Sequence, residues 1–170
     1  MAEYSSFFKS IGKDRKYKAD QFAEYFRAFL TDGVFPQDDG LQLQVTADGS
    51  DMNVDVNTGK SWIQGYYYSN TTSKELTITP SDTINDRIDR IVARVDLNDD
   101  YRSVKLYVKT GTPAETPTAP TLTRELSTGA LQYEIALADV YVAANVTVIE
   151  NTDITDQRLN EDVCGVVNSL

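Results

Sequence analysis

Short runs in which apolar and polar residues alternate one by one dominate this chain, and this alternation constrains the fold more than any other feature. A strand places successive side chains on opposite faces, so a period of two predicts strands with one buried face. The clearest pair is a run over 90–97 and a run over 104–109, joined by a turn at 98–100. Because no long helix separates the runs, the pattern is typical of an antiparallel β-sandwich or barrel.

Further strands are predicted on both sides of this pair. Before it, the sequence indicates a hairpin of residues 41–45 and 52–56 around Asp48-Gly49, a strand-like stretch at 60–68, and a short strand that stops at Pro80. After it, a Thr- and Pro-rich loop over 110–130 leads to an apolar stretch at 133–142. The inward phase of that stretch slips between Leu137 and Ala138, which predicts a β-bulge or a strand buried on both faces. Val146 and Val148 are candidates for a last short strand.

One segment near the N-terminus has a helical period instead. Over about residues 20–31, apolar residues recur at i, i+3, i+4, i+7 and i+8, namely Phe22, Tyr25, Phe26, Phe29 and Leu30. Asp20 is the predicted N-cap, and Gly33 suits the left-handed position after the last turn. We expect this aromatic stripe to pack on a sheet. The alternative is a helix that binds a partner.

The chain contains no histidine and a single cysteine, Cys164. These residue types supply most general bases, thiol nucleophiles and transition-metal ligands. We therefore expect a protein that is not an enzyme, with no catalytic residues, no bound cofactor and no metal site. Cys164 is expected to be a small, semi-buried apolar residue.

Paired carboxylates are the remaining route to catalysis, since glycoside hydrolysis needs only two of them. Asp86 and Asp89 alternate with Arg87 and Arg90, and neighbouring guanidinium groups lower carboxylate pKa values, whereas a general acid needs a raised pKa. A structural ion-pair cluster is therefore favoured. Asp139 lies within an apolar stretch, where we expect it to hydrogen-bond to backbone or to pair with an arginine.

A calcium site is a weaker alternative at the acidic turn after residue 95. Its candidate ligands are Asp96, Asn98, Asp99 and Asp100. Their spacing is not that of an EF-hand, and a polar hairpin turn explains the same residues.

The net charge of −10 opposes binding to nucleic acid and to an anionic membrane surface. No apolar run approaches the length of about 20 residues that spans a bilayer. The first 18 residues lack the apolar core of a signal peptide, so we expect synthesis and folding in a reducing cytoplasm.

Basic charge is concentrated locally in an N-terminal arm, residues 1–17. Lysines and arginines at 9, 13, 15, 16 and 18 are interleaved there with aromatic residues. The arm is either a solvated terminus or an element that docks onto an acidic neighbour, for which a second copy of this acidic chain is one candidate. The candidate contact residues are Phe7, Phe8, Arg15 and Tyr17.

A second aromatic group is a candidate surface patch, formed by Trp62, Tyr66, Tyr67 and Tyr68. In a strand, Tyr66 and Tyr68 point one way and Tyr67 the other, so at least one side is expected to be partly exposed. Core and rim packing, a protein interface and a platform for sugar rings are the three alternatives for these side chains.

Several stretches together resemble tail and baseplate structural proteins of long-tailed phages of Gram-positive bacteria, most closely a small tail protein of a Bacillus-infecting siphophage. The matching stretches are YSSFFKSIGKDRKYKADQFAEYF, GKSWIQGYYYSN, INDRIDRIVARVDL, VKLYVKTGTPAETPTAP and YEIALADVYVAANVTVIENTDITDQRLNEDVCG. The resemblance implies a virion protein whose β-sandwich is similar to the shoulder domain of lactococcal phage receptor-binding proteins. It supplies no catalytic residues.

The resemblance further implies a role in attachment or assembly through other tail or baseplate proteins, with a homo-oligomer in the virion. Relatives extend into stalks or receptor-binding regions beyond this module, so for a chain that ends at Leu170 we do not expect direct host recognition. The expected organisation is an arm (1–17), a helix with a sandwich (18–160) and a C-terminal tail (161–170) that gains order on docking. Binding of host cell-wall polysaccharide is the alternative function.

Overall fold

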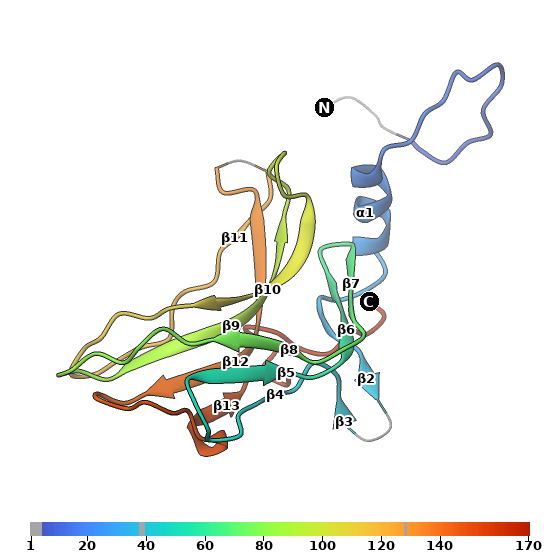
Figure 1. Ribbon diagram of the computed structural model, residues 1–170. Helices are drawn as coiled ribbons and strands as arrows, with labels where there is room; N and C mark the ends of the chain where they lie inside the picture. Colours follow the sequence, from blue (N-terminus) through green and yellow to red (C-terminus); the bar gives the residue numbers. More distant parts are fainter. Residues whose placement is uncertain (1–4, 38–39, 128) are drawn as a thin grey trace.

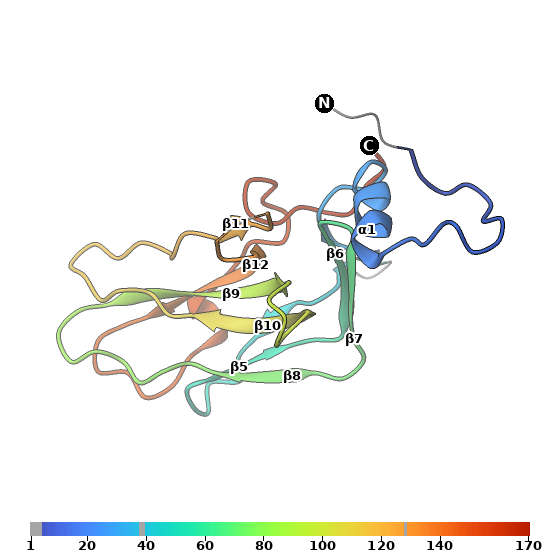
Figure 2. The same ribbon diagram turned by 90° about the horizontal axis from the view of Figure 1, so that it is seen from above.

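Two antiparallel sheets form the body of the molecule, and a third sheet at one end carries the helix (Figures 1 and 2). The computed structural model describes residues 5–37, 40–127 and 129–170. One α-helix, α1 (Ala19–Arg27), lies in this part of the chain, and the rest of its regular structure is almost entirely strand. The predicted fold class, a mainly β antiparallel sandwich with one N-terminal helix, is confirmed.

The strands are β1 (Gly33–Val34), β2 (Pro36–Gln37), β3 (Gly40–Leu41), β4 (Val45–Thr46), β5 (Asn53–Val56), β6 (Gly59–Ile63), β7 (Tyr66–Asn70), β8 (Lys74–Thr77), β9 (Arg87–Asp96), β10 (Ser103–Lys109), β11 (Arg124–Glu125), β12 (Gln132–Val142) and β13 (Ile154–Asp156). A 3₁₀ turn, η1 (Asn151–Asp153), precedes β13.

The larger sheet has the strand order β10-β9-β12-β11, and β13 pairs with β12. β9 and β10 form the hairpin that the sequence predicts, with Leu106 opposite Ala93. Both side chains lie on the buried face. The apolar alternation therefore predicts the register of this hairpin as well as its existence.

The sheet β4-β5-β8 faces the larger sheet, and the hydrophobic core lies between them. β4 and β5 form the hairpin predicted around Asp48-Gly49, with Val45 opposite Val56. Both sheets contribute apolar residues to the core, including Val45, Val54, Val56, Ile78, Ile91, Val95, Ile135 and Val140. These residues are the apolar members of the alternating runs, so burial of one face of each run drives the stacking of the two sheets.

β12 contains the bulge that the slip in its apolar pattern predicts. Ala136 pairs with Val92 and Ala138 pairs with Ile91, so Leu137 is an extra residue on this strand. Leu137 and Ala138 are both buried. A bulge changes which face each later residue occupies, and here it keeps the apolar residues on both sides of it in the core.

The stretch at 60–68 is a tight hairpin rather than one continuous strand-like run. β6 and β7 pair through a two-residue connection, Gln64-Gly65, and both residues have positive φ (52° and 84°). This is the backbone of a turn whose twist matches that of its strands, and glycine at the second position favours it. The hairpin stands at the end of the sandwich, between the body and α1 (Figure 2).

The last residues of the chain pair with the segment that follows α1. Leu30 bridges to Ser169 and Val34 bridges to Val166, and the N–H of Thr31 donates to the carbonyl of Asn168 (2.9 Å). The tail predicted to order only on docking is therefore already hydrogen-bonded to the body. These long-range bonds take up backbone groups that a longer helix would need, and α1 accordingly ends at Arg27 and not near residue 31.

The predicted caps of the helix, Asp20 and Gly33, are wrong. Lys18 is the N-cap residue, and its backbone N–H donates to Oε1 of Gln21 (2.8 Å). Asp20 lies inside the first turn, where its charge favours the helix dipole. Gly33 begins β1, and a Cβ atom there would lie 2.3 Å from the carbonyl oxygen of Gly165.

The last strand is β13, and Val146 and Val148 lie outside the strands. Ile149 nevertheless reaches the core, and its N–H donates to the carbonyl of Asp51 (2.8 Å). The apolar residues at 146–149 therefore belong to an irregular connection that is partly buried, and they do not form a strand.

Candidate protein-interaction surface

Helix α1 and the turn after it present an aromatic stripe to solvent. Phe22, Tyr25, Phe26 and Phe29 are 45%, 48%, 41% and 50% exposed, and Ala23 is the buried residue of the helix. The ring of Phe26 contacts Trp62 of β6, but the stripe as a whole is about half exposed, so the expectation that it packs on a sheet holds only in part. The alternative from the sequence, a helix face that binds a partner, stays a prediction.

A narrow contact joins α1 to the body. Ala23 lies against the β6–β7 turn so closely that a Cβ atom on Gly65 would be 2.1 Å from the carbonyl oxygen of Ala23. Asp32 then fastens the same turn, because its carboxylate accepts from the backbone N–H and from Nε2 of Gln64 (2.6 Å each). Since the small residues meet the body, the large aromatic residues are left on the outer side.

The N-terminal arm folds onto the exposed face of α1. The ring of Phe7 lies 5.2 Å from Phe22 and 4.9 Å from Tyr25, measured between ring centroids. From its contact with the helix, the arm runs out as a loop away from the sandwich (Figures 1 and 2). We call the side chains of Phe7, Tyr17, Phe22, Tyr25, Phe26 and Phe29 the aromatic face.

The structure brings together the four arm residues that the sequence proposes for partner contact. The hydroxyl of Tyr17 accepts from the N–H of Phe8 (2.6 Å) and donates to its carbonyl (3.1 Å). The ring of Phe7 lies 5.2 Å from that of Tyr17, and the guanidinium of Arg15 lies 5.4 Å from the ring of Phe8. The described part of the arm is thus a closed loop with its own side-chain contacts. Residues 1–4 of the predicted arm lie outside the described residues.

The second candidate patch divides between two sides of its hairpin. Tyr66 and Tyr68 pack against the core, and burial raises the pKa of both phenols. Trp62 and Tyr67 lie opposite one another in the β6–β7 ladder, on the face of the hairpin that does not carry Tyr66 and Tyr68. Tyr67 is 52% exposed, in line with the expectation that one side of the run reaches solvent.

Trp62 links this patch to the aromatic face. Its ring lies 5.5 Å from Phe26 and 6.4 Å from Tyr67, and Tyr67 in turn lies 6.4 Å from Phe35. Ring contacts therefore continue without a break from the arm, along α1, to the end of the sandwich. The sequence suggests two separate aromatic groups. They become continuous because α1 packs on the β6–β7 turn through Ala23, which brings Phe26 beside Trp62.

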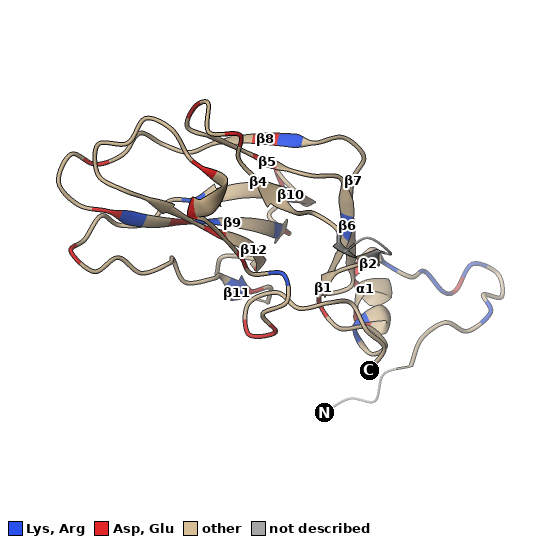
Figure 3. Ribbon diagram, turned by 90° about the horizontal axis from the view of Figure 1, so that it is seen from below, with Lys and Arg blue, Asp and Glu red and all other residues tan. Residues whose placement is uncertain are grey.

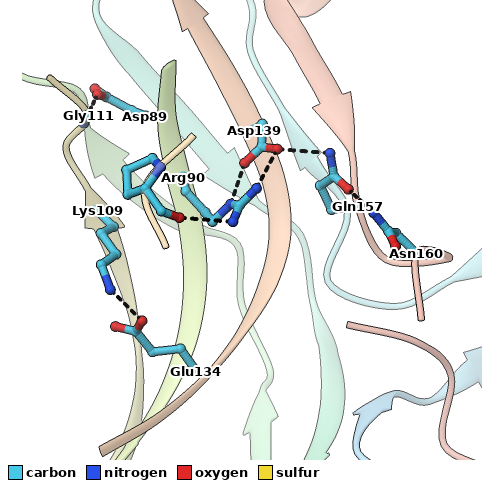
Figure 4. Close-up of polar contacts among 9 residues, drawn as sticks. Asp89, Arg90, Lys109, Gly111, Glu134, Asp139, Gln157 and Asn160 are labelled. Carbon is cyan, nitrogen blue, oxygen red and sulfur yellow. Dashed lines mark hydrogen bonds and ion pairs between the residues drawn. The ribbon is translucent and has the colours of Figure 1, made fainter. Parts of the chain in front are cut away.

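The carboxylates tested for catalysis are engaged in structural contacts. Asp89 accepts from Nε of Arg87 (2.9 Å), an ion pair of the predicted cluster. It also accepts from the N–H of Gly111 (2.8 Å; Figure 4). Asp86 accepts from the hydroxyl of Tyr141 and from the N–H of Ala144, and these bonds lower the pKa of Asp86. A lowered pKa is the opposite of what a general acid requires.

Asp139 pairs with an arginine, as expected. Nε and Nη2 of Arg90 donate to its two oxygens (2.6 and 2.9 Å), and Nε2 of Gln157 donates as well (2.9 Å). Nη1 of Arg90 also donates to the carbonyl of Pro120 (2.9 Å). The pair thereby holds the Pro-rich loop against the outer face of the larger sheet (Figure 4).

Glu134 is a buried carboxylate that the sequence reading misses. It is 0% exposed and accepts from Nε of Arg94 (2.8 Å), Nζ of Lys109 (2.7 Å) and the N–H of Thr123 (2.6 Å). Burial raises the pKa of Glu134, but these hydrogen bonds outweigh burial and hold the pKa below its ordinary value. A charged residue inside the apolar stretch 133–142 is the sequence feature that indicates a buried, paired carboxylate at this position.

The acidic turn has the hydrogen bonds of a hairpin connection. Oδ1 of Asp96 accepts from the N–H and from Nδ2 of Asn98 (3.0 and 2.7 Å), and Oδ2 accepts from Nε2 of Gln132 (2.8 Å). This is the turn chemistry that the sequence favoured over calcium. Over residues 5–37, 40–127 and 129–170, no group of three or more acidic, histidine or cysteine residues is arranged to hold a metal ion.

No helix in the described part of the chain is long and apolar enough to cross a membrane. No family model, no curated protein and no solved structure matches the chain. The aromatic face and its neighbour Trp62 are the features on which a functional assignment rests.

Proposed function

We propose that this chain is a structural protein of a phage tail or baseplate, not an enzyme, and that it attaches to its neighbours through the aromatic face. The observation that carries the proposal is the exposure of the aromatic stripe on α1 and the turn after it, where Phe22, Tyr25, Phe26 and Phe29 are each between 41% and 50% exposed. Connected exposed rings of this kind are typical of protein interfaces, whose energetic centres are enriched in aromatic side chains. The resemblance of the sequence to tail proteins supports the assignment to a virion.

In this mechanism the sandwich is a rigid platform and the arm with α1 is the docking element. Completing the burial of a half-exposed aromatic ring contributes about 1 kcal/mol, roughly half of the value for full burial. The four rings of the stripe therefore contribute about 4 kcal/mol, which does not by itself offset the entropy lost on association. A stable attachment thus needs the arm as well, whose loop already has side-chain contacts of its own.

The partners in this proposal are other tail or baseplate proteins, and the chain is made in the host cytoplasm before it enters the virion. The first test is electron microscopy of purified particles of the phage that encodes this chain, labelled with antibody against it. Label at the tail tip would support the proposal. Label absent from intact particles, with the protein present in infected-cell lysate, would contradict it.

Alanine variants then test whether the aromatic face is the attachment element. Replacing Phe22 and Phe29 with alanine should leave a folded sandwich, because both rings lie outside the core, but should strongly reduce the amount of this chain in purified tails. Ile84→Ala is the matched control, since Ile84 is an 81% exposed apolar residue away from α1. Equal incorporation of all variants would show that the aromatic face is not the attachment element.

Binding of cell-wall polysaccharide is the second candidate, favoured by the pairing of Trp62 with the half-exposed Tyr67. Aromatic faces of this kind stack on sugar rings. Binding on a glycan array that is lost with Tyr67→Ala would support this function. An array without signal for the unmodified chain would count against it.

A further inference from the structure

Charge divides this chain into a basic end and an acidic body. Residues 1–31 hold six lysines and arginines against four acidic residues, whereas residues 32–170 hold ten against 22. The basic residues of the arm project from the molecule beside α1, and acidic residues are spread over the loops of the body (Figure 3). A surface complementary in charge to the arm is therefore present on every copy of the chain.

The tip of the arm is an ordered turn that exposes apolar side chains. Oδ1 of Asp14 accepts from the N–H of Ile11 (2.7 Å) and from Oγ of Ser10 (3.3 Å). Ile11 is 78% exposed and Phe8 is 56% exposed. An element that is already shaped for contact loses less conformational entropy on binding.

A groove of about 740 Å³ lies between the start of α1 and the turn of the β9–β10 hairpin. Tyr66, Val95, Leu97 and Val104 supply apolar surface to its lining. Its charged lining residues are Asp20, Asp99, Lys18 and Arg102, with Asp99 at the β9–β10 turn. The next residue, Asp100, is exposed. The arm leaves α1 on the side away from the β9–β10 turn, so the arm of the same copy does not fill the groove (Figure 1).

We infer that the arm of one copy docks into this groove on a second copy. Phe8 and Ile11 enter the apolar part, and the basic residues that follow, Lys13 and Lys16, meet Asp99 and Asp100. The two surfaces differ, so the contact is head-to-tail, and repeated around an axis it closes into a ring. This inference rests on the proposed function, because it names the neighbour to which the arm attaches.

Sedimentation of the purified chain tests the inference without any other tail protein. We expect association at about 0.05 M salt that weakens at about 0.5 M, because salt shortens the range of charge interactions between exposed groups. Ile11→Asp should raise the dissociation constant at least about tenfold, since a charge enters an apolar groove. Lys74→Glu on β8 is the control for charge reversal outside the contact. A chain that is monomeric at every salt concentration would overturn the inference.

A charge-swap experiment identifies the two surfaces. The double variants Lys13→Glu/Lys16→Glu and Asp99→Lys/Asp100→Lys should each associate at least about tenfold more weakly than the original chain. A chain with all four changes should recover association, because the arm and the rim of the groove are complementary again. Failure of the combined variant to recover, or association unaffected by either reversal, would show that the contact lies elsewhere.

The same variants separate this inference from the proposed function. If the chain is monomeric in solution but Lys13→Glu/Lys16→Glu still excludes it from tails, the arm attaches to a different protein and the inference alone fails. If the chain associates as described but is absent from virions, the proposed function alone fails.

Discussion

Glu134 and Asp139 lie five residues apart on β12, yet both face the same side of the sheet, where Glu134 is opposite Arg94 and Asp139 is opposite Arg90. In a regular strand an odd spacing would place them on opposite faces. The extra residue at Leu137 reverses which face each later residue occupies. The bulge therefore places Glu134 and Asp139 on the same face of the sheet and keeps the apolar residues on both sides of it in the core. The two ion pairs hold the Pro-rich loop through Pro120 and Thr123.

Glu134→Gln should lower the free energy of unfolding by about 3 kcal/mol at pH 7, because it leaves two buried or half-buried cations without their counter-charge. Chemical denaturation monitored by circular dichroism measures this change. Glu75→Gln, at an exposed carboxylate on β8, is the matched control and should change stability by less than about 0.5 kcal/mol. Similar values for the two variants would show that the Glu134 cluster does not stabilise the fold.

The same cluster predicts acid sensitivity. The folded-state pKa of Glu134 is below its ordinary value, so its contribution to stability is present above the unfolded pKa and is lost as the pH falls through the folded pKa. The unmodified chain should lose stability below about pH 4.5, and Glu134→Gln should lose less over the same interval. Unfolding free energies measured between pH 6 and about pH 3 check the sign. Parallel curves for the two proteins would contradict it.

Gly65→Ala should displace α1 and leave the sandwich folded. The added Cβ atom would meet the carbonyl oxygen of Ala23 at 2.1 Å, and φ at this position is +84°. Trp62 is the single tryptophan of the chain and contacts Phe26 of α1, so its fluorescence should shift to longer wavelength as that contact opens. Far-ultraviolet circular dichroism should retain the strand signal.

Gly129→Ala is the control for this variant, because Gly129 also has positive φ (+66°) but has nothing within 4 Å of the added atom. It carries the backbone strain without the clash. A tryptophan spectrum that responds equally to both substitutions would show that the close approach of Gly65 to Ala23 does not position α1.

Cys164 should be unreactive in the folded protein. Its side chain is buried although it belongs to the C-terminal tail, and burial raises the pKa of the thiol to about 12. Because the thiolate is the reactive form, a disulfide reagent at pH 8 should modify the folded chain slowly and the urea-unfolded chain rapidly. Cys164 is the sole cysteine, so the released chromophore reports on it alone. Rapid reaction without urea would show that the segment around residue 164 detaches readily from the body.

The sequence by itself predicted the main strands and their apolar faces from a local period of two, and the slip at Leu137 indicated a bulge as one of two alternatives. It did not predict the short strands β1, β2, β11 and β13, and the strand that it suggested at Val146 and Val148 is absent. It also predicted that α1 exists and that Asp139 has a polar partner, either backbone or an arginine; the structure shows that the partner is Arg90.

The tertiary structure decided where α1 ends, because Leu30 pairs with Ser169 at the other end of the chain. It decided equally that the aromatic stripe faces solvent, since Ala23 meets Gly65 of the β6–β7 turn. A periodic pattern encodes which side chains share a face, whereas contacts between distant segments decide what covers that face.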